Sequence, residues 1–568
     1  MSAYRERTSI NHLEVAHEAL SRGAWETARA WFEDSLDQQE TAEAWEGLAI
    51  AAWWQNDAET ALPARLRAYR LFCETHDRRG AARVAAFHAI DYCSLRNEPA
   101  IASGWLRRAH RLLEGQSTSP EHAMVLLWEG HIALSVEQDT GRARDLSRRA
   151  FELSRSIGEL DWQMFALALE GLAMVYDGEV DEGMRYLDEA ATAAVAGDLR
   201  DLDAIGTICC YLIMACERVR DYVRAAQWCD IVKKVSARWS YRLLFSLCWT
   251  HYAGVLIGRG AWDEAEVILT EAISNLNGSH QAMAADGLAR LAELRRRQGR
   301  LDEAEALYKR VDGQPLSWLA REYVLLGRAS LALEQSDAQR AIDLADRFMR
   351  ALGPDDHVER ASGLAMLARA RAALGGTEAD ECDSADSLDN LNPEVASPLV
   401  IGTARYAQGM FAVTAGELEK ARRRFEDAVD SFAVSGAPYE QGLARLELSC
   451  VLSALGRHRA AREEAQHAWQ QMLDLGARDS AERARILLTR IPDGDSHGSV
   501  GPSRTSKLTT RELELLRLVA DGLTDKEISE RLDLSVHTVH RHLGNVRTKL
   551  AVPSRSAAVS MAARMGLI

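Results

Sequence analysis

The sequence predicts an all-α protein in which a superhelix of stacked helical hairpins precedes a separate four-helix domain. Two observations predict this fold class. Only 11 of 568 residues are proline, and apolar residues recur at helical spacing without strand-like alternation. A short motif also returns about every forty residues along most of the chain, as in stacked structural units. We therefore expect a repeat body over 1–490, a flexible linker over 491–506 and a terminal domain over 507–568.

The repeated motif is a turn-forming residue followed five positions later by alanine or glycine, with most steps at 37 to 42 residues. We expect the first member to end one helix in a tight turn. The small second member then lets the next helix of the hairpin pack closely. The first members are Gly23, Asn56, Asn97, Gln138, Gly178, Arg220, Gly260, Gly299, Ser336, Gly416 and Gly456. The second members are Ala28, Ala61, Ala102, Ala143, Gly183, Ala225, Ala265, Ala304, Ala341, Ala421 and Ala461.

A gap of two steps between Ser336 and Gly416 predicts a degenerate unit near Gly375. The segment 375–398 is acidic and polar, so we expect a loop or a loosely ordered hairpin there. The whole pattern resembles the tetratricopeptide repeat lengthened to about forty residues, as in the superhelical sensor of MalT-like bacterial regulators. The resemblance implies a long concave surface for a ligand or a protein partner.

The aromatic and sulfur residues of the body favour packing. Trp25 and Trp262 each lie two residues after a repeat glycine, which favours hydrophobic packing of the tryptophans over a ligand cage. The nine cysteines include no CxxC pair, which favours reduced thiols over a disulfide framework. No long uncharged apolar run or signal-peptide core is present. We therefore expect a cytoplasmic protein without a membrane partner.

The terminal domain and the repeat body differ in net charge. Residues 507–568 contain ten Lys/Arg and seven Asp/Glu, whereas the net charge of the whole chain is −16. This asymmetry indicates a basic module attached to an acidic body. The acidic body argues against a protein that coats nucleic acid along its length.

The terminal domain predicts four short helices, each with its own start signal. Thr509 with Glu512, and Thr524 with Glu527, form capping boxes at the first two helices. The second helix is expected over 525–532, and Ser535 caps the third. A fourth helix follows near the end of the chain.

The third helix has an apolar stripe on one side and a basic, acid-free opposite side. At about 100° per residue, Val539, Leu543, Val546 and Leu550 share one face, which we expect to form the core of the domain. The opposite face suits the major groove of DNA. There we predict base contacts at His537, His540, Arg541 and Gly544, and phosphate contacts at Thr524, Thr538, Arg547, Thr548 and Lys549.

The stretch LTTRELELLRLVADGLTDKEISERLDLSVHTVHRHLGNVRTKLAVPSR resembles the LuxR-type helix-turn-helix domain. The resemblance implies that the third helix is the recognition helix and that the fourth supports dimerisation. Thr538, Val539, His540, Arg541 and Lys549 fall at motif positions of that helix. The sequence departs from the family pattern at Ala551, where glycine is usual, and at Arg547 and Gly544.

Enzyme and metal motifs are absent or misplaced in the sequence. There is no GxxxxGK[ST], HExxH or CxxC, and the GxSxG match at 494–498 lies in the linker without a strand or helix around it. His537, His540 and His542 point in different directions around the helix, so they do not converge on one metal ion. We therefore predict no enzyme, no cofactor and no metal.

Together these features predict a sequence-specific DNA-binding transcriptional regulator, and they favour an activator. Its helical repeat body would sense a ligand or protein partner. The expected partners are double-stranded DNA, RNA polymerase and a second copy of the chain. The alternative is a helical-repeat scaffold whose terminal domain mainly makes protein contacts, and salt-sensitive DNA binding would count against it.

Overall fold

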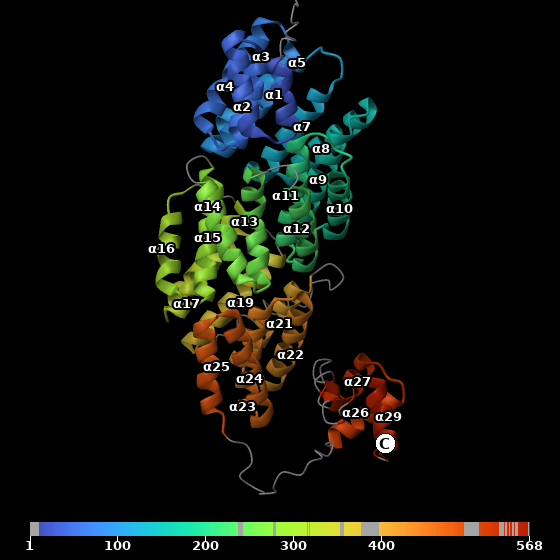
Figure 1. Ribbon diagram of the computed structural model, residues 1–568. Coiled ribbons are helices and arrows are strands. Elements are labelled where there is room, and N and C mark those ends of the chain that lie inside the picture. The colour runs from blue at the N-terminus through green and yellow to red at the C-terminus, as the bar shows by residue number, and fades with distance from the viewer. Residues whose placement is uncertain are drawn as a thin grey trace, which may run out of the picture.

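The structure, a computed structural model, describes residues 11–568 except 237–241, 277–279, 315, 317, 353–356, 376–396, 493–509, 533–538, 540–541, 545, 548–549, 551, 553–554, 566 and 568. Over these ranges the chain forms helices and no strands, and successive helices stack as antiparallel hairpins (Figure 1). The body contains α1 (His12–Ser21), α2 (Trp25–Gln38), α3 (Ala42–Trp54), α4 (Ala58–Glu74), α5 (Arg78–Asp91), α6 (Pro99–Leu113), α7 (Pro120–Ile132), α8 (Thr140–Ile157), α9 (Leu160–Tyr176), α10 (Val180–Ala196), α11 (Leu202–Arg218), α12 (Tyr222–Ser236), α13 (Arg242–Gly258), α14 (Trp262–Leu276), α15 (Gln281–Arg297), α16 (Leu301–Val311), α17 (Trp318–Glu334), α18 (Ala338–Ala351), α19 (His357–Leu374), α21 (Pro398–Thr414), α22 (Leu418–Ser435), α23 (Pro438–Ala454), α24 (His458–Leu475) and α25 (Arg478–Arg490). The terminal domain contains α26 (Thr510–Ala520), α27 (Asp525–Leu532) and α29 (Arg555–Arg564).

The turn of every predicted repeat unit adopts the left-handed backbone conformation. The first members named above all have positive φ, between 54° at Asn97 and 84° at Gly178, and Gly375 of the degenerate unit has φ 71°. This conformation lets the chain cap the carbonyls at the end of the first helix of each hairpin. At Gly178, for example, the next amide donates from Glu179 N to Met174 O at 2.9 Å. The predicted turn positions are therefore confirmed.

The small residue five positions later is buried in each unit. Every alanine among the predicted second members is fully buried. At Gly183, an added Cβ would lie 2.6 Å from the carbonyl oxygen of Gly171 on α9, so the two helices touch at their backbones. The fold class predicted from the sequence, a tetratricopeptide-like solenoid followed by a small helical domain, is confirmed by this regular geometry.

Two features of the body differ from the sequence prediction. Cys210 on α11 and Cys248 on α13 form a disulfide across 38 residues, so the expectation of reduced thiols is wrong for this pair. The two cysteines lie on neighbouring hairpins, about one repeat step apart, and sequence spacing alone did not indicate their proximity. In addition, α5 and α7 end in π-helical turns, η1 (Tyr92–Arg96) and η2 (Ala133–Glu137), which the repeat pattern did not predict.

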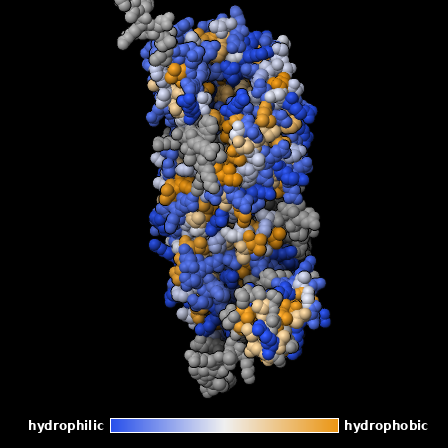
Figure 2. Space-filling view, turned by 45° about the vertical axis from the view of Figure 1, so that its right-hand side comes forward, coloured by the Kyte–Doolittle hydropathy of each residue, from blue (hydrophilic) through white to orange (hydrophobic). Residues whose placement is uncertain are grey.

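The face of the molecule in Figure 2 is mainly hydrophilic along the body, with small scattered apolar areas. This agrees with a solenoid whose apolar residues are buried between stacked hairpins. In the part of the chain that the structure describes, no helix is both long and apolar enough to cross a bilayer. Most of the predicted loop 375–398 and linker 491–506 lies outside the described residues.

Candidate nucleic-acid interface

The first helix of the terminal domain ends, and the second begins, at the predicted signals, whereas Thr509, the predicted cap of the first helix, lies outside the described residues. Gly522 has φ 88° and ends the turn after α26. At α27, Thr524 N donates to Glu527 Oε2 at 2.7 Å and Glu527 N donates to Thr524 Oγ1 at 3.3 Å. These reciprocal bonds form the predicted capping box. The bonds from Thr524 also hold the pKa of the Glu527 carboxyl below its ordinary value. The helix has the predicted bounds, Asp525–Leu532.

The apolar stripe of the third helical segment lies in the core of this domain. Val539 and Val546 are fully buried and Leu543 is nearly so. The stripe fits between α26 and α27 on one side and α29 on the other. Leu550 packs at the edge of the same core. The contacting core residues are Leu515, Leu518, Val519 and Ile528 for one cluster, and Leu516, Ala558 and Ala562 for the other.

The other side of this segment is open at the one groove-facing position that the structure describes. A Cβ added at Gly544 would meet nothing within 4 Å. Thr524 and Arg547, two of the predicted phosphate contacts, are exposed. The remaining predicted contacts, His537, Thr538, His540, Arg541, Thr548 and Lys549, lie outside the described residues, as does Ala551.

One supporting residue was not singled out by the sequence. Arg555, at the start of α29, donates from Nη1 to Asp525 Oδ1 at 2.6 Å and from Nη2 to the carbonyl oxygen of Leu523. The guanidinium thereby joins the last helix to the start of α27. Helical periodicity carries no indication of this contact, because it depends on how a long side chain crosses between two helices.

Across the described ranges, no three His, Cys, Asp or Glu side chains are grouped so that they could hold a metal ion. The domain presents a short helix with a capped start, a buried apolar stripe on the next helical segment and an open position, Gly544, opposite that stripe. This is the arrangement of a helix-turn-helix module, in which the helix after the turn, here the third helical segment of the domain, enters the major groove.

The fold and this interface define a helical-repeat protein with a DNA-binding helix-turn-helix domain. Residues 506–562 match the family model described as bacterial regulatory proteins, luxR family. The terminal domain is therefore a LuxR-type helix-turn-helix domain, and the resemblance seen in the sequence is confirmed.

Two curated relatives have regulatory names. RamA of Corynebacterium glutamicum, an HTH-type transcriptional activator, is 29% identical over 202 residues, which are 33% of this chain and 68% of that protein. MalT of Vibrio campbellii, an HTH-type transcriptional regulator, is 29% identical over 206 residues, which are 34% of this chain and 22% of that protein. The crystal structure of the APC/C hetero-tetramer Cut9–Hcn1 aligns with 83% of this chain and 96% of that chain, at TM-score 0.40 and 13% identity. The family match and the two relatives support a DNA-binding transcriptional regulator.

Proposed function

We propose that this chain is a sequence-specific transcriptional activator that reads DNA through the third helical segment of residues 507–568. The observation that carries the proposal is the two-sided character of that segment. Val539, Leu543 and Val546 are buried against the other helices, whereas an added side chain at Gly544 would meet only open space. On a helix, the side opposite the buried stripe is the one available to a groove.

The proposed base readers occupy that available side of the sequence. Arg541 is the expected bidentate partner of guanine, and His537 and His540 are expected to donate to base edges. The exposed Arg547 and Thr524 are suited to phosphate oxygens at the groove margins. RamA, which is named as an activator, supports activation over repression for this chain.

Regulation in this proposal comes from the repeat body, residues 1–490. The concave side of the solenoid receives a ligand or protein partner, and the linker 491–506 lets that event change the availability or pairing of the terminal domains. The protein binds DNA as a homodimer through its fourth helix and contacts RNA polymerase from there. Two-fold pairing predicts an operator with two half-sites about one helical turn apart.

A selection experiment tests this function. The full chain is incubated with a randomised duplex pool at about 150 mM salt, where non-specific binding is weak. Bound duplexes are sequenced, and gel shifts then compare wild type, Arg541→Ala and Arg517→Ala. Arg517 is an exposed arginine of α26, so it matches the loss of charge without altering the proposed groove face.

We expect an enriched palindromic sequence that wild type and Arg517→Ala bind alike. Arg541→Ala should lose about tenfold or more on that sequence, since one base-reading arginine contributes roughly 1–3 kcal/mol. If no sequence is enriched, or if both variants bind every duplex as wild type does, the terminal domain does not read DNA sequence and the scaffold alternative gains.

A further inference from the structure

The first half of the solenoid turns far enough for its start to touch a much later hairpin. Asn56, in the turn after α3, accepts a hydrogen bond at Oδ1 from His280 Nδ1, 224 residues away, at 2.7 Å. Trp54 of α3 packs in one cluster with Leu276 of α14 and Ala284 of α15. These contacts close the concave side of α3–α15 into a ring of helices.

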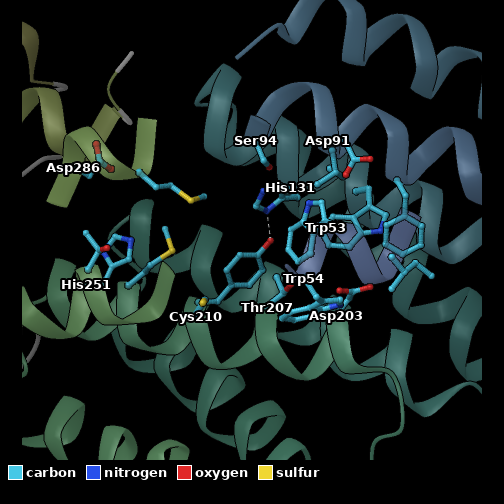
Figure 3. A pocket seen from close by; sticks show the side chains of 18 of the residues that line it. Trp53, Trp54, Asp91, Ser94, His131, Asp203, Thr207, Cys210, His251 and Asp286 are labelled. Atoms are coloured by element: carbon cyan, nitrogen blue, oxygen red, sulfur yellow. Dashed lines mark hydrogen bonds between the residues drawn. The ribbon is translucent and has the colours of Figure 1, made fainter. Parts of the chain in front are cut away.

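A cavity of about 160 Å³ lies within this ring. Side chains from α3, α4, α5, η1, α7, α11, α13 and α15 line it, so it belongs to no single hairpin (Figure 3). In Figure 3, Asp91, Asp203, Trp53 and Trp54 lie toward one end, whereas His251 and Asp286 lie toward the other. A cavity of this size accommodates a molecule of roughly ten non-hydrogen atoms.

Aromatic rings form most of one end of the cavity. Trp54 is held by stacking on Trp25, with ring centroids 4.8 Å apart and planes 8° apart, and Trp53 meets Trp54 edge-on at 5.1 Å. Phe87, Trp128 and Tyr211 complete the aromatic lining. The sequence favoured packing for the tryptophans. That holds for Trp262, which is buried and bonded to Ile257 O, but Trp53, Trp54 and Trp128 also face a cavity.

The charges at this end do not balance. Arg65 and Asp91 form an ion pair in which both side chains are nearly completely buried. The Asp203 carboxyl also lines the cavity, and among the described residues it has no hydrogen-bond or ion-pair partner. One guanidinium therefore faces two carboxyl groups, and Asp203 has no cationic partner of its own beside several aromatic faces.

The other polar groups of the cavity do not supply a compensating cation. Burial lowers the pKa of His131 to about 4, so its ring is neutral near pH 7, and its Nδ1 is bonded to the Tyr211 hydroxyl at 2.5 Å. His251, toward the opposite end, is bonded to Glu217 at 2.6 Å. Burial and the neighbouring charge of Asp201 raise the pKa of Asp203 to about 7, against the opposing charge of Arg65. The cavity is thus lined by a carboxyl group that ionises reluctantly.

We propose that this cavity binds a small organic ammonium ion, with its positive charge against Asp203 and its apolar part against the rings of Trp53 and Trp54. The aromatic rings bury the apolar part of such a ligand and their faces favour a nearby positive charge, and the Asp203 carboxylate supplies the matching charge. A carboxylate ligand would have to compete with Asp91 for Arg65 and would place a second acidic group beside Asp203. A neutral ligand would leave Asp203 as a protonated carboxyl and would gain no charge contact there, so it should bind more weakly than a cation.

This inference names the class of ligand that the repeat body binds. It rests on the proposed function only in that binding would then regulate the DNA-binding domain. Calorimetry on the full chain without DNA tests it, using benzylamine, benzyl alcohol and benzoate as cationic, neutral and anionic probes of similar size. We expect benzylamine to bind with a dissociation constant of about 1 mM or lower, which is reasonable for so small a molecule. Benzyl alcohol should bind at least about tenfold more weakly, and benzoate not measurably.

Matched variants separate a charge contact from loss of structure. Asp203→Asn keeps the shape of the side chain, and we expect it to weaken benzylamine about tenfold or more without changing benzyl alcohol. Asp198→Asn, at an exposed position before α11, should leave both probes unchanged. Trp53→Leu should weaken benzylamine by several-fold, because one aromatic face is lost.

Proton release gives a second readout. Benzylamine beside Asp203 should displace the proton that this carboxyl holds near neutral pH. Because the buffer takes up that proton, the apparent binding enthalpy should vary with the ionisation enthalpy of the buffer. Asp203→Asn releases no proton, so its binding enthalpy should not depend on the buffer. The inference would be overturned if benzylamine shows no saturable binding below about 10 mM, or if benzyl alcohol binds as tightly as benzylamine. Stronger binding of benzoate, or an Asp203→Asn variant that binds benzylamine as wild type does, would also overturn it. DNA selection without a probe tests the proposed function separately, so either can fail alone.

Discussion

Asn56 and His280 form a hydrogen bond that closes the first superhelical turn across 224 residues. Burial lowers the pKa of His280 to about 4, so the ring is neutral near pH 7 and its Nδ1–H is the donor. The Asn56 side chain also donates to the carbonyl oxygen of Asn275. One asparagine in a left-handed turn thus connects the start of the body to the α14–α15 hairpin.

Asn56→Gly should lower the free energy of unfolding by about 1–2 kcal/mol, since both side-chain hydrogen bonds are lost. Glycine retains the positive φ of 62° at this position, so the substitution adds no backbone strain. Asn97→Gly is the matched control, because Asn97 is exposed and has a φ of 54°. Chemical denaturation measures both. Equal effects of the two variants would show that the closure contributes nothing.

Asp203→Asn should make the protein more stable at pH 8, by up to about 4 kcal/mol, and leave it nearly unchanged at pH 4. The pKa of Asp203 is about 7 in the folded chain and 3.8 ordinarily, so the native state holds an extra proton between these values. Wild-type stability from this group therefore falls as pH rises from about 4 to 7, and asparagine removes that loss. Denaturation at the two pH values, with Asp198→Asn as control, measures the difference. A variant that is less stable than wild type at pH 8 would contradict this.

Arg555→Met should loosen the terminal domain and weaken DNA binding without altering the proposed base readers. The substitution removes the bonds from the guanidinium to Asp525 and to Leu523 O, at a cost of about 1–2 kcal/mol. Hydrogen exchange of α26, α27 and α29 in the full chain should speed up by about tenfold. Arg517→Met, which removes an exposed arginine of α26, provides the comparison. Unchanged exchange in Arg555→Met would mean that the contact is not used in solution.

Reduction of the Cys210–Cys248 disulfide should lower the melting temperature. Opening a 38-residue loop costs about 3–4 kcal/mol by the loop-entropy relation. Alkylation of the denatured, unreduced chain followed by mass spectrometry should label every cysteine except these two. The double variant Cys210→Ala/Cys248→Ala should then lose its sensitivity to reductant. Labelling of both cysteines without reductant would refute the pairing.

The parts of the fold that follow from local geometry were predictable from the sequence. Gly178 and Asn97 mark turns because only certain residues adopt positive φ readily, and Ala28 marks close packing because only a small residue fits between paired helices. The Asn56–His280 closure was not predictable, because it depends on the summed rotation of several hairpins. A small change in the angle of each hairpin would separate the two residues.

The same distinction applies to the terminal domain. The helical period was enough to predict that Val539, Leu543 and Val546 would share one side, and the structure buries all three. The contact of Arg555 with Asp525 joins residues 30 positions apart through a long side chain, so no sequence period encodes it. The base contacts at His537, His540 and Arg541 remain predictions that only a DNA complex or a binding experiment can test.

Genome-wide mapping of the protein on DNA in its own cells tests the central claim most directly. Cells expressing the full chain, its Arg541→Ala variant or its Arg517→Ala variant are crosslinked, and the bound fragments are sequenced. We predict a limited set of sites upstream of genes that share one palindromic sequence, occupied alike by wild type and Arg517→Ala and lost in Arg541→Ala. Uniform fragments without a shared sequence, or the same occupancy with Arg541→Ala, would contradict the assignment of this chain as a sequence-specific regulator.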